Sequence, residues 1–292
     1  MSADRPGPVV VGVTNPEHVQ QLVRTAADLA ALGSGTVRLV SVAVKDHTSP
    51  FGVFDDETIV AEFAERSHEL VDAVEAPGDV ILERQVVAAR SAAGGLESAV
   101  REAEADALVV GWSGPASRAD AVLGSTTDEL VERVPCDLYV ERVGREAGGV
   151  DSVLVPVAGG PHIPAAARVA AAIARRNDAT VVILSVDTGA EGRSAPGSVA
   201  EGREAVLATL SLDSAIETRT IEAGDATDAI VAAAADHDVL VLGATRQGKL
   251  RRRLTGSVPR RVVDRTNLTV ILARDGAAVG GVAGRLGRIL RT

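Results

Sequence analysis

Runs of β-branched and other apolar residues alternate with longer Ala-rich segments along the whole chain. The runs are short and continuous, which is typical of parallel strands buried on both faces, whereas the Ala-rich segments have a helical period. The clearest predicted helix covers 17–32, because Leu22, Ala26 and Leu29 lie on one apolar stripe of it. The pattern predicts ten strands, at 9–13, 36–43, 79–87, 107–112, 138–143, 152–157, 180–186, 215–222, 238–243 and 268–273.

The chain contains an internal repeat. The run 9–13 matches 153–157 at an offset of 144 residues, and the run 106–111 matches 238–243 at an offset of 132. The second copy is therefore shorter in its middle by 12 residues, the difference between the two offsets. A repeat of this kind predicts two tandem units with the same fold.

The predicted fold class is α/β, with two tandem doubly wound domains that each contain a five-stranded parallel sheet. The predicted domains are 1–146 and 150–275, and a Gly-rich linker joins them. Residues 276–292 are rich in Gly and Arg and are predicted to form a flexible tail. Doubly wound sheets bind ligands beyond the carboxyl ends of their strands, at the point where the strand order reverses.

Composition and charge exclude several classes of function. The net charge of −10 disfavours nucleic acid, and an aromatic content of 2% leaves few rings on which bases stack. Cys136 is the one cysteine, so a disulfide within the chain is excluded and a reducing compartment is expected. The five histidines have no metal-ligand spacing, so no metal site is predicted. No apolar run is long enough to span a membrane, and we expect a cytoplasmic protein without stable membrane insertion.

Glycines and serines follow the fourth predicted strand of both copies with the same spacing. The first copy carries Gly111 and Gly114, then nine residues, then Gly124 and Ser125; the second carries Gly243 and Arg246, then nine residues, then Gly256 and Ser257. Glycine lets a ligand approach the main chain without a Cβ in the way. The serines are predicted N-caps of the next helix, where free N–H groups and the helix dipole favour an anion such as phosphate. The spacing predicts a phosphate-binding loop in each copy; the alternative is that these residues only form turns and caps.

This G-x2-G-x9-G-[ST] arrangement, on a five-stranded α/β repeat, resembles the ATP-binding branch of the universal stress protein family. The resemblance covers both copies and implies an adenine nucleotide alpha hydrolase-like fold. In this family the loop cradles the ribose and phosphates of ATP or a related adenine nucleotide, together with Mg²⁺ when the ligand is ATP. It implies nucleotide-binding roles for the loop residues of both copies, and for Val42 and Val186, which match the family's adenine-side position.

Three positions depart from the family pattern. The family has Asp after the first strand, where this chain has Thr14 in the first copy and Ala158 in the second. A charge-assisted hydrogen bond contributes about 1.5–3 kcal/mol, so its loss predicts weak or absent nucleotide binding. In the second copy Arg246 replaces a loop glycine, which adds bulk but also allows an ion pair with a phosphate. The first copy, whose loop glycines are complete, is the better candidate.

Three further residues near the predicted loops allow two interpretations each. His18 and His162 occupy equivalent positions after the first strand of each copy, where a polar side chain either orients a ligand or serves the start of a helix. Trp112 either stacks on a ligand or fills the cleft.

The resemblance implies a regulatory or sensor protein of the stress response, in which nucleotide occupancy biases an interaction surface, and not an enzyme. One alternative is a slow ATPase. Another is an interaction module that binds no nucleotide and regulates a partner such as a membrane transporter, because motifs of the second copy resemble stress domains attached to haloarchaeal transporters. An acidic, lysine-poor chain fits a haloarchaeal source and a GC-rich genome equally.

The resemblance also implies how the two copies associate. In the family the last strand pairs domains, here 138–143 and 268–273. We therefore expect these strands to pair within the chain or in a homodimer.

Overall fold

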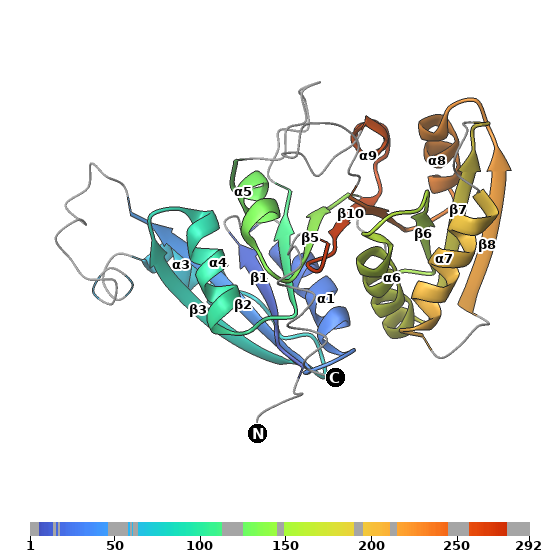
Figure 1. The fold of residues 1–292 in the computed structure, drawn as a ribbon. Helices are drawn as coiled ribbons and strands as arrows, with labels where there is room; N and C mark the ends of the chain where they lie inside the picture. Colours follow the sequence, from blue (N-terminus) through green and yellow to red (C-terminus); the bar gives the residue numbers. More distant parts are fainter. Residues whose placement is uncertain are drawn as a thin grey trace.

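The computed structural model describes residues 6–13, 16, 18–45, 58, 60, 64–112, 125–144, 149–189, 195–210, 215–244 and 257–278. Within these residues ten strands form one sheet, in the order β3-β2-β1-β4-β5-β10-β9-β6-β7-β8 (Figure 1). Neighbouring strands are parallel within each half of the sheet. At the centre β5 and β10 are antiparallel, so the two copies meet edge to edge through equivalent strands.

Each half alternates strands and helices, as the apolar pattern predicts. The first half consists of β1 (Val9–Val13), α1 (Val19–Ala30), β2 (Thr36–Val44), α3 (Glu65–Asp72), β3 (Ile81–Ala89), α4 (Ala92–Glu102), β4 (Ala107–Gly111), α5 (Ser125–Arg133) and β5 (Asp137–Arg142). The second half consists of β6 (Ser152–Pro156), α6 (Ile163–Asn177), β7 (Thr180–Asp187), α7 (Ala195–Leu207), β8 (Ile216–Glu222), α8 (Ala226–Ala234), β9 (Val239–Gly243), α9 (Ser257–Arg265) and β10 (Thr269–Arg274). The α/β fold with two tandem doubly wound halves is confirmed.

The predicted strand and helix ends differ from the observed ones by at most two residues, and at two of the starts the local backbone gives the reason. The third predicted strand starts at Ile81 rather than at 79. Gly78 has a φ of 38°, and the Val80 N–H donates to the carbonyl of residue 77 in a turn that delays the strand. The predicted helix 17–32 begins only at Val19, because His18 has a left-handed φ of 69° that a right-handed helix does not accommodate.

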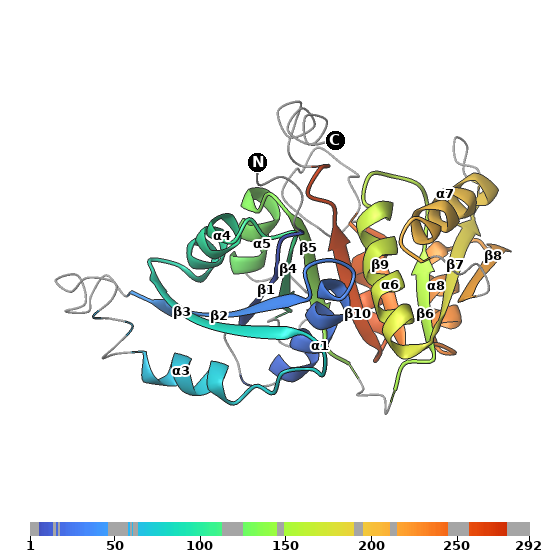
Figure 2. The same ribbon diagram turned by 90° about the horizontal axis from the view of Figure 1, so that it is seen from below.

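Helices cover both faces of the sheet, and the core on each face is continuous across the two halves. One core contains side chains from α1, α3, α6 and α7 with one face of the strands, and the other contains side chains from α4, α5, α8 and α9 with the opposite face. Helices α1 and α6 pack against each other over the central strands, as Figure 2 shows from below. The sequence predicts a five-stranded sheet in each of two domains, whereas the structure joins these sheets, and the cores on both faces, through β5 and β10.

Candidate functional site

The predicted loops begin where the fold rule places a ligand. In the first half β4 lies beside β1 and ends at Gly111, and in the second half β9 lies beside β6 and ends at Gly243. In the order β3-β2-β1-β4-β5, the chain runs from β1 outward to β3 and then returns to β4 on the other side of β1. The carboxyl ends of β1 and β4 therefore flank the switch point of the first half, and those of β6 and β9 flank its equivalent.

The two strand-terminal glycines differ in what a side chain there would contact. A Cβ on Gly111 would lie 3.3 Å from Cδ1 of Leu22 on α1, a tight contact. A Cβ on Gly243 would lie 3.6 Å from the nearest atoms, those of His162, which is an ordinary contact. Neither glycine has a positive φ. Packing against α1 thus gives Gly111 a structural role that Gly243 does not share.

Both loops lead to the first turn of a helix. Helix α5 starts at Ser125, which is exposed, and α9 starts at Ser257. Both serines are thus the first helical residue, one position later than the predicted N-cap, a shift within the usual uncertainty of helix ends. The first turn of α9 has no acidic residue, whereas α5 has Asp128 there, which competes with a bound anion for the helix dipole.

The remaining predicted site residues are only partly described. Val42 is buried on β2, and Val186 is half-buried near the end of β7. A Cβ on Gly95 of α4 would lie only 2.7 Å from Cγ1 of Val42, so α4 packs directly on that position. Ala158 is exposed in the turn after β6. Thr14, Gly114, Gly124, Arg246 and Gly256 lie outside the described residues, and so do the basic residues of 249–253.

His162 and Trp112 contact the protein itself, whereas His18 is exposed. His162 is buried at the N-cap position of α6, but its side chain does not cap the helix; its Nδ1 accepts the N–H of Asp275 at 3.1 Å. His18 holds the N-cap position of α1, again without a side-chain cap. The Trp112 side chain is half-buried against the α4–α5 core, and the backbone N–H of Trp112 donates to the Glu141 carbonyl at 2.7 Å.

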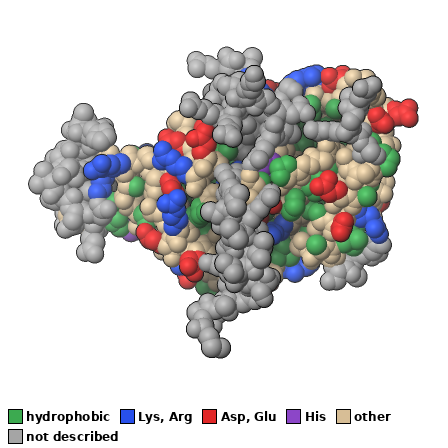
Figure 3. Space-filling view, in the orientation of Figure 1, with side chains coloured by type: hydrophobic (Ala, Val, Ile, Leu, Met, Phe, Trp, Pro, Cys, Tyr) green, Lys and Arg blue, Asp and Glu red, His purple; other side chains and the backbone are tan. Residues whose placement is uncertain are grey.

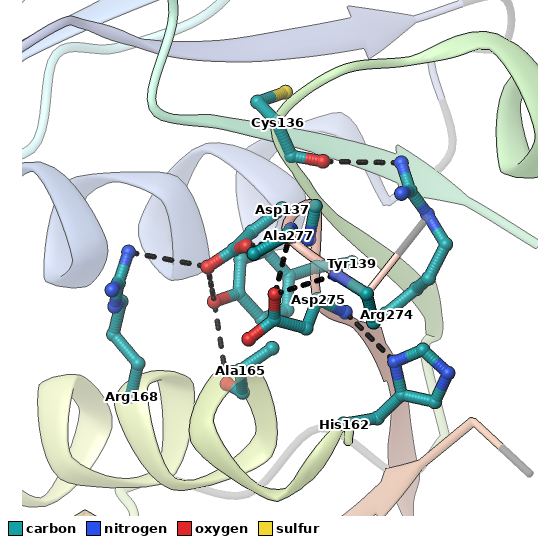
Figure 4. A network of polar contacts seen from close by, with 11 residues as sticks. Cys136, Asp137, Tyr139, His162, Ala165, Arg168, Arg274, Asp275 and Ala277 are labelled. Atoms are coloured by element: carbon teal, nitrogen blue, oxygen red, sulfur yellow. Dashed lines mark hydrogen bonds and ion pairs between the residues drawn. The ribbon is translucent and has the colours of Figure 1, made fainter. Parts of the chain in front are cut away.

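The sequence prediction misses a set of polar contacts between the two halves. They lie at the seam, where β5 pairs with β10, and two arginines that form a clasp across it make most of them. Arg142 and Arg274 end these strands and are equivalent at the offset of 132. Arg274 donates to the carbonyl of Cys136 at 3.1 Å (Figure 4) and to that of Val134 at 2.7 Å. Arg142 donates to the equivalent carbonyls of residues 266 and 268. Each copy therefore binds the chain entering the last strand of the other, and the interaction is made twice.

Two equivalent glycines close the ends of this seam. The N–H of Gly144 donates to Oγ1 of Thr269 at 3.1 Å, and the N–H of Gly276 donates to Oδ1 of Asp137 at 2.9 Å. A Cβ on Gly144 would lie 2.3 Å from backbone atoms of residues 267 and 268, and one on Gly276 would lie 2.6 Å from the Cys136 carbonyl carbon. Glycine is required at both positions because the backbones of the two halves touch there.

The arginine contacts of the seam are equivalent in the two copies. The side chains that lie beneath α1 differ from those beneath α6. Under α6, Arg168 pairs with Asp137 at 3.1 Å, and the Tyr139 hydroxyl donates to the Ala165 carbonyl at 3.3 Å (Figure 4). Burial raises the pKa of Tyr139 well above its usual value, and burial raises that of the Cys136 thiol to about 12. These groups stay neutral and serve structure rather than proton transfer.

A sequence signal for the seam does exist. Asp137, Tyr139 and Glu141 alternate along one strand, which puts three polar side chains on one face of a buried strand. The triplet Arg-x-Gly follows in both copies, at 142–144 and at 274–276.

The described part of the chain has neither a metal-binding cluster nor a helix that could cross a membrane. Within it, no cluster of three or more His, Cys, Asp and Glu side chains is arranged to hold a metal ion. Its helices are also too short or too polar to cross a membrane. On the face shown in Figure 3, the described basic and acidic side chains are interspersed rather than gathered by sign.

Known proteins include relatives of this chain in sequence and solved structures that share its fold. The chain is 30% identical over 179 residues to universal stress protein MT2699 of Mycobacterium tuberculosis, a match that covers 60% of this chain and 64% of the relative. A universal stress protein from Archaeoglobus fulgidus has a similar structure, with a TM-score of 0.60 at 16% identity over 94% of this chain and 98% of that one. The cytoplasmic domain of a prokaryotic cation chloride cotransporter has a TM-score of 0.56 at 10% identity, covering 96% and 99%.

The sequence profile of the universal stress protein family matches the chain twice, at residues 7–142 and 149–274. These two matches correspond to the two halves of the sheet, which the internal repeat and the antiparallel pairing of β5 with β10 relate to each other. The chain belongs to the universal stress protein family and carries two tandem copies of its domain.

Proposed function

We propose that this protein is a regulator that binds an adenine nucleotide weakly at the carboxyl edge of its first half. The observation that carries the proposal is the position of Gly111 and Ser125. Gly111 ends β4 beside the switch point, and Ser125 begins the helix that follows the glycine-rich loop. The first N–H groups of α5 have no partner within the helix, and such groups bind phosphate.

The protein acts by occupancy and not by catalysis in this proposal. A bound nucleotide contacts the loop, α1 and α5, and the loop begins at Trp112, whose N–H is bonded to β5 at the seam. Binding that favours one arrangement of these elements shifts the population of a surface read by a partner in the cytoplasm. Mg²⁺ accompanies the nucleotide only if the ligand is ATP.

Affinity is the quantity that tests the proposal. We expect calorimetric titration of ATP, ADP and AMP to show saturable binding, which Gly124→Val abolishes. The matched control is Gly224→Val, because Gly224 has open space around its Cα. Restoring the family carboxylate with Thr14→Asp is expected to tighten binding by about 10-fold or more, since a charge-assisted hydrogen bond contributes about 1.5–3 kcal/mol.

A second candidate function is an interaction module that regulates a membrane transporter without binding nucleotide. The residues that favour it are Thr14 and Ala158, which leave both copies without the carboxylate. Absence of binding up to millimolar nucleotide in both the wild type and Thr14→Asp would reject the nucleotide site. A pull-down from membrane extract would then test the second candidate.

A further inference from the structure

A small pocket lies at the seam of the two halves, on the face covered by α1 and α6. Its volume is about 130 Å³, and its polar lining includes Arg24, Thr25, Asp28, Glu141, Arg176 and Thr269. At ~30 Å³ per water molecule, it holds about four waters or a ligand of similar size. Arg24, Thr25 and Asp28 come from α1, Arg176 from α6, and the other two from β5 and β10.

Two of the four charged side chains, Arg176 and Asp28, pair with each other. Arg176 Nε lies 3.2 Å from Oδ1 of Asp28, and the same guanidinium also pairs with Asp79. Arg176 is therefore already paired with two carboxyl groups and offers no free guanidinium to a ligand. The charges that a ligand would meet are those of Glu141 and Arg24.

Glu141 is the most deeply buried of the charged groups in this lining. Its side chain is on the strand face covered by α1 and α6, the residue is 1% exposed, and neither carboxylate oxygen has a hydrogen-bond partner. Burial raises the pKa of Glu141 to about 7, although the neighbouring Thr25 and Gln21 side chains oppose part of the rise. Neither of these side chains is placed for a hydrogen bond of normal geometry, and a buried carboxylate without a well-placed donor is costly, so this position favours a ligand that supplies one.

Arg24 stands at the exposed side of the pocket and makes no ion pair with any described residue. Its equivalent at the offset of 144 is Arg168, which pairs with Asp137 at 3.1 Å. The residue equivalent to Asp137 is Thr269, which lines the pocket and has no charge. Arg24 thus lacks the carboxylate partner that Arg168, its equivalent, has in Asp137.

The space in the pocket also results from a residue difference between the two copies. Tyr139 fills the seam under α6, where its hydroxyl reaches the Ala165 carbonyl. Its equivalent at the offset of 132 is Ile271, which lines the pocket and has a shorter side chain without a polar end. Replacing an aromatic ring and a carboxylate by Ile271 and Thr269 leaves a hollow with one unpaired guanidinium.

We propose that this pocket binds a small zwitterion, with its ammonium group donating to Glu141 and its carboxylate pairing with Arg24. The ligand carboxylate takes the part that Asp137 plays toward Arg168 in the other half of the seam. A zwitterion also matches the opposite signs of the two unpaired groups, whereas a cation or an anion alone would leave one of them without a partner. The site is distinct from the proposed nucleotide loop and does not depend on it.

The probe is β-alanine, with n-propylamine and propionate as matched molecules that each lack one of its charges. Binding is measured on the full chain by ligand-observed NMR and by calorimetry. We expect saturable binding of β-alanine, and at least 10-fold weaker binding of the two singly charged molecules. Arg24→Gln and Glu141→Gln are each expected to weaken β-alanine binding at least 10-fold. Arg66→Gln, an exposed arginine on α3, is the matched control and leaves binding unchanged.

Thr269→Asp supplies the missing carboxylate within the chain and keeps an oxygen that can accept the Gly144 N–H, as Asp137 does for Gly276. It is expected to pair with Arg24 and to abolish β-alanine binding. The proposal is overturned if β-alanine shows no saturable binding, if n-propylamine binds equally well, or if binding is unaffected in Arg24→Gln. Because Arg24 is exposed, that variant tests the site even if the buried substitutions prevent folding.

Discussion

At the scale of single residues, the two buried carboxyl groups under α1 are costly to ionise, and this cost shows in their pKa values. Burial raises the pKa of Asp28 to about 7 in spite of its ion pair with Arg176, and Glu141, with a pKa of about 7, opposes its ionisation further. Desolvation exceeds attraction here because both groups lie between two packed helices and a central strand. The protein thus retains two buried carboxyl groups whose protonation changes near neutral pH.

A pH dependence of stability follows from these values. The usual pKa of Glu is 4.5, and that of Glu141 in the folded protein is about 7, so the folded state binds more protons between these pH values. Stability contributed by this group is therefore full below about pH 4.5, falls as the pH rises and reaches its minimum above about pH 7. Glu141→Gln is expected to remove this fall, which amounts to roughly 1–3 kcal/mol.

Urea unfolding at several pH values across this window measures the effect. Glu69→Gln is the control, because Glu69 is exposed on α3. If the wild type and Glu141→Gln lose the same stability between acidic and neutral pH, the assignment to Glu141 is wrong.

At the scale of elements, the junction of β5 and β10 is closed by backbone contacts rather than by apolar side chains alone. Gly144 and Gly276 follow the two strands, and each touches the segment that enters the opposite strand. The clasps by Arg142 and Arg274 add charge-assisted hydrogen bonds to carbonyl groups of the same segments. Close approach of the main chains is possible only without a Cβ.

Gly144→Ala and Gly276→Ala are expected to lower the free energy of unfolding by about 1–3 kcal/mol each, since the added methyl forces the two backbones apart. Gly224→Ala is the control, because its Cβ would meet nothing within 4 Å. Chemical denaturation of the three variants gives the comparison. Equal stability of Gly276→Ala and Gly224→Ala would contradict a tight seam.

At the scale of the whole molecule, the sheet and both cores run through the two halves without a break. Equivalent residues Leu108 and Leu240 are fully buried in one core, although they belong to different copies. Trp112, the single tryptophan, packs against this core in the first half, so tryptophan fluorescence reports on the first half. A continuous core predicts that the two copies unfold together.

Leu240→Ala is expected to lower stability by about 2–5 kcal/mol and to shift the Trp112 fluorescence transition as much as it shifts the circular dichroism transition. Leu108→Ala, the matched variant in the first half, is expected to behave in the same way. A fluorescence transition that stays in place in Leu240→Ala would show that the halves unfold separately.

The local sequence pattern predicts where the strands next to the candidate site end, but it does not predict which side chains contact each other there. Gly111 and Gly243 lie at strand ends as predicted, because apolar runs and glycines mark where buried strands stop. The binding roles of Val42, Val186 and the loop residues, and the boundaries of the two domains, stay predictions. His162 shows why local reasoning fails: its partner, the N–H of Asp275, is 113 residues away in the chain.

The sequence by itself determines the class of fold, the repeat, the order of strands and helices and the family, because periodicity and spacing are properties of neighbouring residues. Only the tertiary structure decides that β5 and β10 join the copies into one sheet, that equivalent arginines clasp that seam, and that Glu141 and Arg24 face one pocket. Those features depend on groups more than 100 residues apart, which packing brings together. Their energies also depend on burial, which local sequence does not specify.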